Sequence, residues 1–284
     1  GSTQMNKENE SDDGYAMGID EAGRGPVLGP LVYGAAYCPL NKIDLLTSLG
    51  FADSKTLTAE ERANSLIDID SSDYIDYELD VISPQTISSS MLRHDKYNLN
   101  LISHDSAIGL IKRVLSKGIR IKEVYVDTVG DPAKYQSKLS CIFPSIRCVV
   151  SKKADSIYPI VSAASICAKT KRDQIIDEWS FKEDSESTSF DRNFGSGYPS
   201  DPRTKSWLAV NSDKVFGFPE FVRFSWTTCT SILKQHCANV LWSDDDDANT
   251  NKITSYFSGG SGNDSKSRKR RYSSVFDYYQ MGPL

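Results

Sequence analysis

The feature that most restricts how this chain can fold is the run Gly18-Ile-Asp-Glu-Ala-Gly-Arg-Gly-Pro26, where a glycine-arginine-glycine turn follows two adjacent acids. Neighbouring side chains on a strand point to opposite faces. Asp20 and Glu21 are therefore expected where a strand ends and its rim is exposed. Carboxylates at such a rim can hold a cation, and the two glycines let the main chain approach a ligand closely. Arg24 between them can grip a phosphate through its forked guanidinium.

The pattern along the rest of the chain predicts an α/β protein with a mixed sheet, a meander first and strand–helix units after it. Two apolar stretches, 15–20 and 31–37, flank a turn rich in proline and glycine, which favours an antiparallel hairpin. Further predicted strands cover 74–81, 124–127 and 146–150. Predicted helices begin at Thr58 with a capping box and cover 98–117, about 132–140, the stretch from Asp155 to about Trp179, 202–211 and 221–240.

The two ends of the chain differ in composition from the part between them. Residues 1–13 are interpreted as a tag remnant and a disordered leader, and residues 244–284 as a mostly disordered tail with partner-binding segments, because neither has the apolar content that ordering requires. Between them we expect a catalytic domain over 14–180 and a helical C-terminal extension over 181–243. No apolar run reaches about 18 residues, so no membrane span is expected.

Charge and cysteine content narrow the classes of function. The formal net charge of −5 argues only weakly against a nucleic-acid partner, because a basic groove can lie beside an acidic metal site. The six cysteines are scattered and form no Cys-x-x-Cys pair. We therefore expect reduced, mostly buried thiols, and neither disulfides nor a zinc site.

Three acids stand at or just past the carboxyl ends of predicted strands: Asp20, Asp127 and Asp155. Ligand sites in open α/β sheets form outside those ends. A sheet that aligns the three strands would gather these acids and Glu21 into one cluster. Four carboxylates so close together require cations, and oxygen ligands favour Mg²⁺ or Mn²⁺. Two such ions, about 3.5–4 Å apart, suit displacement at a phosphodiester.

Taken singly, the same acids leave simpler interpretations open. Asp155 could cap the following helix. Asp127 could cap a turn, and the pair Asp20-Glu21 could be a solvated rim.

Two other classes of function remain as alternatives. Gly23-x-Gly25 after a strand resembles part of a dinucleotide-binding loop, which would suit a nicotinamide-dependent oxidoreductase. That fingerprint requires a helix and a third glycine at a fixed spacing, but the third position is Leu28, and Pro26 and Pro30 disfavour a helix. A non-enzymatic nucleic-acid-binding scaffold is the second alternative. It predicts gaps among the four acids, and all four are present.

Several motifs, in order, resemble one family. Met17-Gly-Ile-Asp-Glu-Ala-Gly-Arg-Gly-Pro26 resembles the signature of type 2 ribonucleases H, the ribonuclease HII family. Its later motifs are similar to Asp53-Ser-Lys-Thr56, Tyr125-Val-Asp-Thr128, Lys152-Lys-Ala-Asp155 and Gly195-Ser-Gly-Tyr-Pro199. Three further segments resemble the eukaryotic branch of the family, which consists of catalytic A subunits of heterotrimeric enzymes. They are Tyr97-Asn-Leu-Asn100, Phe216-Gly-Phe-Pro219 and Val222-Arg-Phe-Ser-Trp226. The resemblance covers roughly residues 14–243.

The resemblance implies a ribonuclease H-like fold, with a mixed five-stranded sheet flanked by helices and a helical C-terminal extension. It implies Mg²⁺-dependent hydrolysis of the RNA strand of RNA–DNA hybrids, with Mn²⁺ as a substitute and two ions per site when substrate is bound. It also implies cleavage 5′ of a single ribonucleotide embedded in duplex DNA, which leaves a 5′-phosphate. Such an activity would serve ribonucleotide excision repair and removal of RNA primers in DNA replication.

The resemblance also implies roles for individual residues. The metal-binding acids correspond to Asp20, Glu21, Asp127 and Asp155. The turn that reads the 2′-hydroxyl, the only local group that separates RNA from DNA, corresponds to Gly23, Arg24 and Gly25. Tyr198 corresponds to a tyrosine that packs on the sugar of the following deoxynucleotide, and Lys55 lies in a matched motif and is expected to bind phosphate.

Other charged residues carry weaker expectations. Phosphates could also be gripped by Lys152, Lys153, Lys169 and Arg172. The three histidines (His94, His104 and His236) match no catalytic motif and are interpreted as structural or surface residues.

The tail carries three further expectations. Lys252-Ile-Thr-Ser-Tyr-Phe257 resembles the segment through which eukaryotic A subunits bind the B and C subunits. It also resembles, more weakly, a sliding-clamp-binding box in which Thr250 replaces the usual glutamine. Arg268-Lys-Arg-Arg271 resembles a nuclear-localisation patch and so indicates the nucleus, with solvated charge as the simpler interpretation.

Overall fold

The computed structural model describes residues 14–48, 57–95, 97–128, 130–184 and 189–238. The expectations for the leader, for Lys55, for the subunit-binding and clamp-binding segments and for the nuclear patch lie outside the described residues. The domain limits proposed from composition stay predictions.

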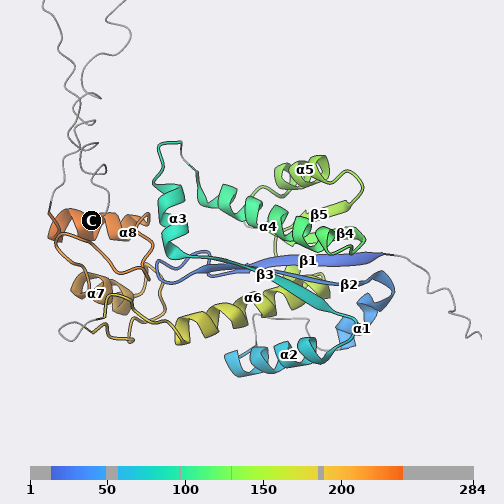
Figure 1. Ribbon diagram of the computed structural model, residues 1–284, viewed down its shortest axis with the longest axis horizontal. Helices are drawn as coiled ribbons and strands as arrows, with labels where there is room; N and C mark the ends of the chain where they lie inside the picture. The colour runs from blue at the N-terminus through green and yellow to red at the C-terminus, as the bar shows by residue number, and fades with distance from the viewer. Residues whose placement is uncertain (1–13, 49–56, 96, 129, 185–188, 239–284) are drawn as a thin grey trace, which may run out of the picture. The chain divides into compact units, whose positions relative to one another are not determined.

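Five strands form one mixed sheet in the order β3-β2-β1-β4-β5 (Figure 1). Their bounds are β1 Tyr15–Ala22, β2 Leu31–Pro39, β3 Asp76–Ile82, β4 Ile121–Asp127 and β5 Arg147–Ser151. β1 pairs antiparallel with β2, and β2 with β3, whereas β1–β4 and β4–β5 are parallel. This confirms the predicted hairpin and the predicted mixed α/β sheet. β2, the next strand in the chain, pairs with one edge of β1, and the later strand β4 pairs with the other edge. Such a change of side opens a crevice at the carboxyl ends of β1 and β4.

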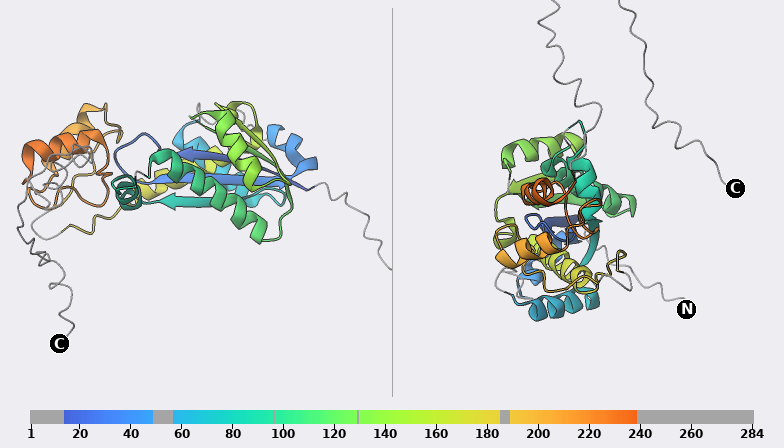
Figure 2. Two further views of the ribbon diagram at one scale, coloured as in Figure 1. Left: turned by 90° about the horizontal axis from the view of Figure 1, so that it is seen from above. Right: turned by 90° about the vertical axis from the view of Figure 1, so that its left-hand side faces the viewer.

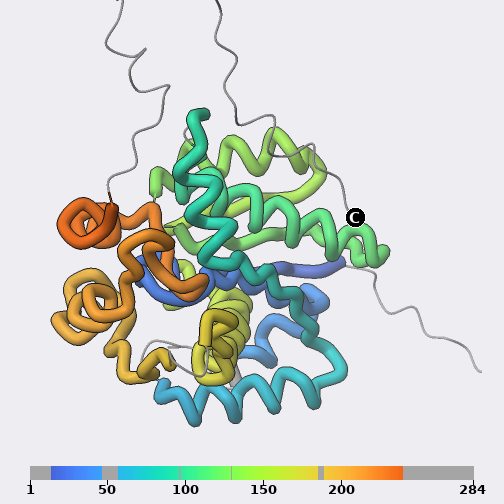
Figure 3. Tube along the Cα trace, turned by 60° about the vertical axis from the view of Figure 1, so that its left-hand side comes forward, coloured from blue at the N-terminus to red at the C-terminus, as the bar shows by residue number. Residues whose placement is uncertain are grey.

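Helices cover both faces of the sheet. Their bounds are α1 Ile43–Ser48, α2 Ala59–Ser71, α3 Pro84–Met91, α4 Leu99–Ser116, α5 Pro132–Ile142, α6 Pro159–Asp177, α7 Pro202–Val210 and α8 Thr227–His236, with the 3-10 helices η1 Leu40–Lys42 and η3 Ala154–Ser156. α4 and α5 lie on one face, and α6 with α2 behind it lies on the other (Figures 1 and 3). None of the described helices is long and apolar enough to cross a membrane.

Alternation along the strands separates the two cores. On β2, Tyr33, Ala35 and Tyr37 belong to the core under α4 and α5, while Ala36 and Cys38 belong to the core under α6. This is the two-residue period of a strand whose two faces are both covered. The same period on β1 decides on which face each of its acids lies.

α6 packs against the sheet at unusually short range because β1 and β2 present glycines to it. A Cβ at Gly18 would lie 2.3 Å from the Ile160 carbonyl oxygen, and one at Gly34 would lie 2.5 Å from that of Ala164. The small residues 162–165 of α6 are all fully buried, and their size allows a helix to pack this closely on a sheet. This contact sets the height of α6, and of η3 before it, above the strand ends.

The last helix differs from its prediction. α8 begins at Thr227, not near residue 221. Residues 221–223 instead pair with the loop after β1, since Gly29 N–H donates to the Phe221 carbonyl (2.8 Å) and Arg223 N–H donates to that of Val27 (2.9 Å). Main-chain groups engaged in this pairing are not available to a helix.

The C-terminal part of the described chain forms its own apolar cluster around Trp207 and Phe221, with Phe181 and Phe194 in ring contact with them. In Figure 2, α7 and α8 lie at the end of the sheet where β1 and β4 finish. The cluster therefore forms a wall beyond the crevice.

The short helix α3 was not predicted from the sequence. Ser83 caps its amino end by accepting from Thr86 N–H, and Pro84 occupies its first turn. Both are ordinary signals for the start of a helix, so the local sequence did carry the information.

Candidate active site

β1 does not end at Asp20, where the sequence predicts its end. It leaves β4 after Ile19 but stays paired with β2 through Ala22. Asp20 and Glu21 therefore lie within a strand that is open on one side only, and their side chains take opposite faces. Asp20 shares its face with Gly18, toward α6, and is only 6% exposed, so the solvated-rim interpretation is wrong for it.

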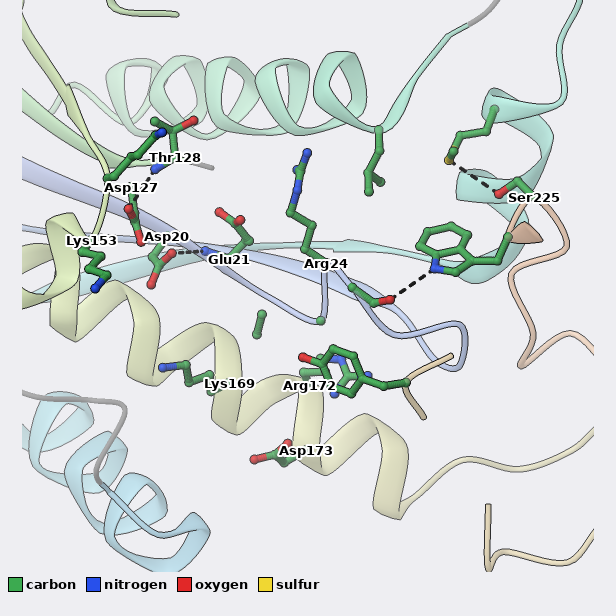
Figure 4. A pocket seen from close by; sticks show the side chains of 18 of the residues that line it. Asp20, Glu21, Arg24, Asp127, Thr128, Lys153, Lys169, Arg172, Asp173 and Ser225 are labelled. Carbon is green, nitrogen blue, oxygen red and sulfur yellow. Dashed lines mark hydrogen bonds between the residues drawn. The ribbon is translucent and has the colours of Figure 1, made fainter. Parts of the chain in front are cut away.

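Three of the four predicted acids converge. Carboxylate oxygens of Asp20, Asp127 and Asp155 all lie within 4.8 Å of one another. Asp127 ends β4, and its Oδ1 accepts from Thr128 N–H (2.9 Å) and Ala154 N–H (3.2 Å). The second bond ties the end of β4 to η3, which carries Asp155. Figure 4 shows Asp20 and Asp127 directed toward each other beside Lys153.

Asp155 does not cap α6. That helix begins at Pro159 after Tyr158, and Asp155 is buried in the short η3 turn. The residue that starts this turn, Lys153, has a φ of 58°. This left-handed backbone conformation is rare for residues other than glycine. Such strained backbone concentrates at functional sites, and here it stands two residues before a clustered acid.

Glu21 stands apart from the other three acids because it points to the opposite face, toward α4 (Figure 4). Tyr33, its cross-strand neighbour in register, donates a hydrogen bond to it. Burial is the main cause that raises the pKa of Glu21 to about 7; the Arg24 guanidinium opposes the shift and the Asp127 carboxylate adds to it. Glu21 is thus near enough for the Asp127 and Asp155 carboxylates to raise its pKa, but it does not belong to the group of three convergent acids.

The acid cluster fits a divalent cation. Burial, and then the nearby Glu21 and Asp127 carboxylates, raise the pKa of Asp20 well above its ordinary value. Oxygens that share one Mg²⁺ at about 2.1 Å lie roughly 3–4 Å apart, and the oxygens of Asp20, Asp127 and Asp155 all lie within 4.8 Å of one another. An all-oxygen set with no histidine or cysteine suits Mg²⁺ or Mn²⁺ rather than zinc. A cation would offset the repulsion that these carboxylates now exert on one another.

The glycine-arginine-glycine turn is held from behind by two side chains. Arg223, fully buried, donates to the carbonyls of Gly23 (2.6 Å), Arg24 (3.2 Å) and Gly29 (2.8 Å). Trp226 stacks on this guanidinium at 5.0 Å and donates from Nε1 to the Gly25 carbonyl (3.2 Å). Consecutive carbonyls of the turn therefore all point into the protein.

This anchoring decides what the turn offers to a ligand. The C=O and N–H of a trans peptide point in opposite directions, and no cis peptide is found in the described residues. The amide groups of Arg24 and Gly25 therefore point away from Arg223. The turn can present these two donors to a hydroxyl or phosphate oxygen without side-chain bulk.

The Arg24 side chain takes a direction of its own. Its guanidinium donates to Ser103 Oγ and Asn100 Oδ1 on α4. Figure 4 shows it pointing, like Glu21, to the α4 side of the sheet. The predicted grip on phosphate would therefore act on that side.

Tyr198 lies against the turn and is half-exposed, as a residue that stacks on a ligand should be. Val27 N–H donates to the Gly197 carbonyl (2.8 Å), which ties the Tyr198 loop to the turn. A Cβ at Gly25 would lie 3.0 Å from Tyr198 Cε1. Glycine at position 25 thus lets the tyrosine ring lie directly beside the main chain of the turn.

One cleft of about 1220 Å³ joins these parts. Its lining includes the acids Asp20, Glu21 and Asp127, the turn 23–25, Tyr198, Lys152, Lys153, Lys169 and Arg172. Arg172 is largely committed to structure, because it donates to the carbonyls of Pro30 (3.1 Å) and Leu28 (3.2 Å). The three lysines are placed to meet phosphates along the cleft, and their predicted role stays a prediction.

Sequence reasoning missed the residues that support the site. Arg223 and Trp226 belong to the motif Val222–Trp226, from which no role for them is predicted, and no sequence pattern marks Tyr33 and Ser165, which hydrogen-bond Glu21 and Asp20. An arginine in an otherwise apolar run, Phe-Val-Arg-Phe, was the signal available for Arg223, since arginine is almost never fully buried unless paired.

Comparison with known proteins points to one family. Residues 17–229 match the sequence profile described as Ribonuclease HII. The chain is 50% identical to the A subunit of ribonuclease H2 from Homo sapiens, over 85% of this chain and 81% of that protein. It is 52% identical to the protein of the same name from Arabidopsis thaliana, over 92% of this chain and 84% of that protein.

Solved structures agree with these sequence matches. The ribonuclease H2 of Pyrococcus horikoshii OT3 superposes with a TM-score of 0.66 at 34% identity, covering 79% of this chain and 100% of that one. The ribonuclease HII of Archaeoglobus fulgidus, solved as a complex with PCNA, gives 0.63 at 31% identity, covering 81% and 99%.

Proposed function

Because this chain belongs to the ribonuclease HII family and is a ribonuclease H-type enzyme, we propose that it is an endoribonuclease that cuts the RNA strand of RNA–DNA hybrids and cuts 5′ of a single ribonucleotide embedded in duplex DNA. One observation carries the proposal most directly. Asp20 and Asp127, whose carboxylates converge with that of Asp155, line the same cleft as the amide-presenting turn at 23–25. Acids that would hold the catalytic cations therefore stand beside a turn that could recognise a ribose.

The four acids would hold two divalent cations, Mg²⁺ with Mn²⁺ as a substitute, which supply Lewis-acid stabilisation of the charge that develops on the phosphate and on the leaving 3′ oxygen. Asp20, Asp127 and Asp155 would provide oxygens from the α6 side, and Glu21 would provide one from the α4 side. Ser165 and Tyr33 fix the carboxylates that they contact by hydrogen bonds. The acids are thus oriented before substrate arrives.

Recognition of the ribonucleotide would come from the turn. The Arg24 and Gly25 amides can donate to a 2′-hydroxyl oxygen, a group absent from DNA. Tyr198, lying beside Gly25, would pack on the next sugar and favour one without a 2′-hydroxyl. The pair would select a junction at which a ribonucleotide is followed by a deoxynucleotide, as ribonucleotide excision repair and primer removal require.

Partners and location are further parts of the proposal. The relatives named as A subunits support companion B and C subunits, and the archaeal complex with PCNA supports contact with a sliding clamp. The basic segment 268–271 supports action in the nucleus.

The test is cleavage of a duplex that carries one ribonucleotide, with Mg²⁺ and with the companion subunits. Asp20→Asn and Asp127→Asn should each reduce the rate by at least about 1000-fold, because each removes a charged oxygen from the cation site. Tyr198→Ala should lower kcat/KM more on the single-ribonucleotide duplex than on a long hybrid, whereas Tyr198→Phe should keep the preference. An uncut duplex, or unchanged cleavage by the Asp variants, would refute the proposal.

A further inference from the structure

A second pocket, of about 310 Å³, opens on the other face of the sheet edge. Glu21, Arg24, Asp127 and Thr128 line it as well as the main cleft. Its remaining lining comes from β2, from α4, from the start of the segment after β4 and from α5: Tyr33, Asn100, Ser103, His104, Gly130, Asp131, Lys134, Tyr135 and Lys138. The pocket is thus continuous with the proposed active site but bounded by different helices, and the proposed cleavage assigns it no role.

Three cations face this pocket: Arg24, Lys134 and Lys138. The acids nearby are engaged. Asp131 caps α5 by accepting from Ala133 N–H (3.1 Å) and Lys134 N–H (3.4 Å).

The other acids around the pocket are occupied too. Asp105 lies 3.8 Å from the Lys138 ammonium and accepts from the Tyr97 hydroxyl. Asp127 accepts two main-chain bonds in the acid cluster. Glu21 also lines the pocket, where it lies within the influence of the Arg24 charge. A cation held by the acid cluster would offset its negative charge and leave Arg24, Lys134 and Lys138 to attract an anion.

Two side chains that line the pocket, Tyr135 and Asn100, can still donate a hydrogen bond to a ligand. The Tyr135 hydroxyl is buried and has no hydrogen-bond partner among the described residues, although the residue is only 5% exposed. A buried polar group left without a partner costs about 1–3 kcal/mol, so an acceptor in the pocket would relieve it. The Asn100 amide accepts from Arg24 through Oδ1, which leaves its NH₂ group as a donor.

His104 also lines the pocket, beside Tyr135. Its ring stacks on that of Tyr135, with centroids 3.8 Å apart and an angle of 18°. Burial, and then the Lys138 and Arg24 charges, lower the pKa of His104. The two cations thus add to the effect of burial, and an anion placed nearby would reverse part of their contribution.

We propose that the pocket between α4 and α5 binds a phosphate group through Arg24, Lys134, Lys138 and the Tyr135 hydroxyl. Its source rests on the proposed function: it is either a backbone phosphate of the cleaved strand, one or more nucleotides from the scissile bond, or the 5′-phosphate of a product. Arg24 would then join the two sides of the site, its main chain facing the ribose and its guanidinium facing this phosphate.

The first experiment needs no catalysis. Inorganic phosphate is titrated into the full chain while the imidazole resonances of His104 are followed by NMR, with His104→Gln for assignment. Phosphate should raise the His104 pKa in the wild type. The double variant Lys134→Gln/Lys138→Gln should bind phosphate at least about tenfold more weakly, because charged hydrogen bonds are lost. Lys112→Gln/Lys122→Gln removes the same charge outside the pocket and should bind as the wild type does.

Tyr135→Phe separates binding from folding. Removing an unpartnered hydroxyl should leave the Tm unchanged or raise it, yet phosphate affinity should fall. A lower Tm with unchanged phosphate affinity would show that the hydroxyl serves the fold and would overturn its assigned role.

The second experiment distinguishes the two sources of phosphate. Duplexes with one ribonucleotide carry a single neutral methylphosphonate at successive positions of the cleaved strand. If a strand phosphate occupies the pocket, one position should cost the wild type about tenfold in kcat/KM and cost Lys134→Gln/Lys138→Gln nothing further. If the product phosphate occupies it, no position should show this, and inorganic phosphate should inhibit the wild type more than the double variant.

Failure of this proposal differs from failure of the proposed function. Normal cleavage, together with no His104 response to phosphate and equal behaviour of both double variants, would overturn the pocket assignment alone. Absence of cleavage on every duplex would refute the nuclease assignment and leave the phosphate titration as the test of the pocket.

Discussion

At the scale of single residues, the site depends on side chains that never touch substrate. Arg223 is the clearest case. Burial, and then the Arg172 charge, lower the pKa of Arg223 to about 9, yet three carbonyl partners and an aromatic ring keep its guanidinium satisfied. The guanidinium donates to these carbonyls from three separate nitrogens, whereas the three donors of an ammonium all start from one. The shape of the turn is therefore set by a residue about 200 positions away in sequence.

Arg223→Lys tests this role. The ammonium keeps the charge but cannot reach Gly23, Arg24 and Gly29 together, so we expect a loss of about 3 kcal/mol in the free energy of unfolding. We also expect the preference for a single ribonucleotide over an all-DNA duplex to shrink, because the amides lose their fixed direction. Steady-state kinetics on both substrates and denaturant melts measure the two effects.

Arg192→Lys is the matched control, since Arg192 donates to the Asp177 and Trp179 carbonyls away from the turn. It should lose stability without losing selectivity. If Arg223→Lys also kept its selectivity, Arg223 would be a purely structural residue.

At the scale of elements, the acid cluster depends on how closely α6 approaches the sheet. β1 and β4 each carry one acid, and η3, immediately before α6, carries the third. Glycine at positions 18 and 34 lets the α6 backbone lie almost on the strands. A change in this spacing would move Asp155 relative to Asp20 and Asp127.

Gly34→Ala should therefore impair cation binding although it lies outside the cleft. The added methyl would stand 2.5 Å from the Ala164 carbonyl oxygen, and overpacking of this kind costs about 1–3 kcal/mol. We expect a lower Tm and a weaker affinity for Mg²⁺ by calorimetry. Gly109→Ala on α4, where a Cβ meets nothing within 4 Å, should instead stabilise by about 0.5–1 kcal/mol. If Gly34→Ala left the Mg²⁺ affinity unchanged, the packing of α6 on the sheet would not control the geometry of the acid cluster.

At the scale of the whole molecule, the crowded acids link stability to pH and to cations. In the folded chain the pKa of Glu21 is about 7, against 4.5 as its ordinary value, and Asp20 shifts in the same direction. The folded state therefore holds protons that the unfolded state has released between these values. By linkage, this contribution lowers stability as the pH rises through that window.

Without divalent cations, the Tm should thus fall more steeply between pH about 5 and 7.5 in the wild type than in Glu21→Gln, which cannot titrate there. Mg²⁺ should raise the Tm, and more at pH 7.5 than at pH 5, because the cation needs ionised carboxylates. Thermal melts across pH with Mg²⁺ or EDTA measure both effects. A wild-type slope no steeper than that of Glu21→Gln would contradict the assigned shift.

The sequence by itself determined the elements and the chemical inventory. The two-residue and helical periods predicted the hairpin, β4, β5 and the long α4 and α6, since those periods are local properties of the chain. The acids at strand ends predicted a cation site, because ligand sites in open α/β sheets form outside the carboxyl ends of the strands. The motif order then predicted the family and the mixed five-stranded sheet.

Tertiary structure alone decided how those residues meet. Side chains alternate along β1 between the face covered by α4 and the face covered by α6, which puts Asp20 and Glu21 on opposite faces. The parallel pairing of β1 with β4 brings Asp127 close to Asp20. Residues 221–226, predicted as part of a helix, instead make contacts with the distant segment 23–29 and support the glycine-arginine-glycine turn. A contact with α4 likewise sets the direction of the Arg24 side chain. Local patterns do not encode such pairings, because they depend on which buried groups find partners once the chain is compact.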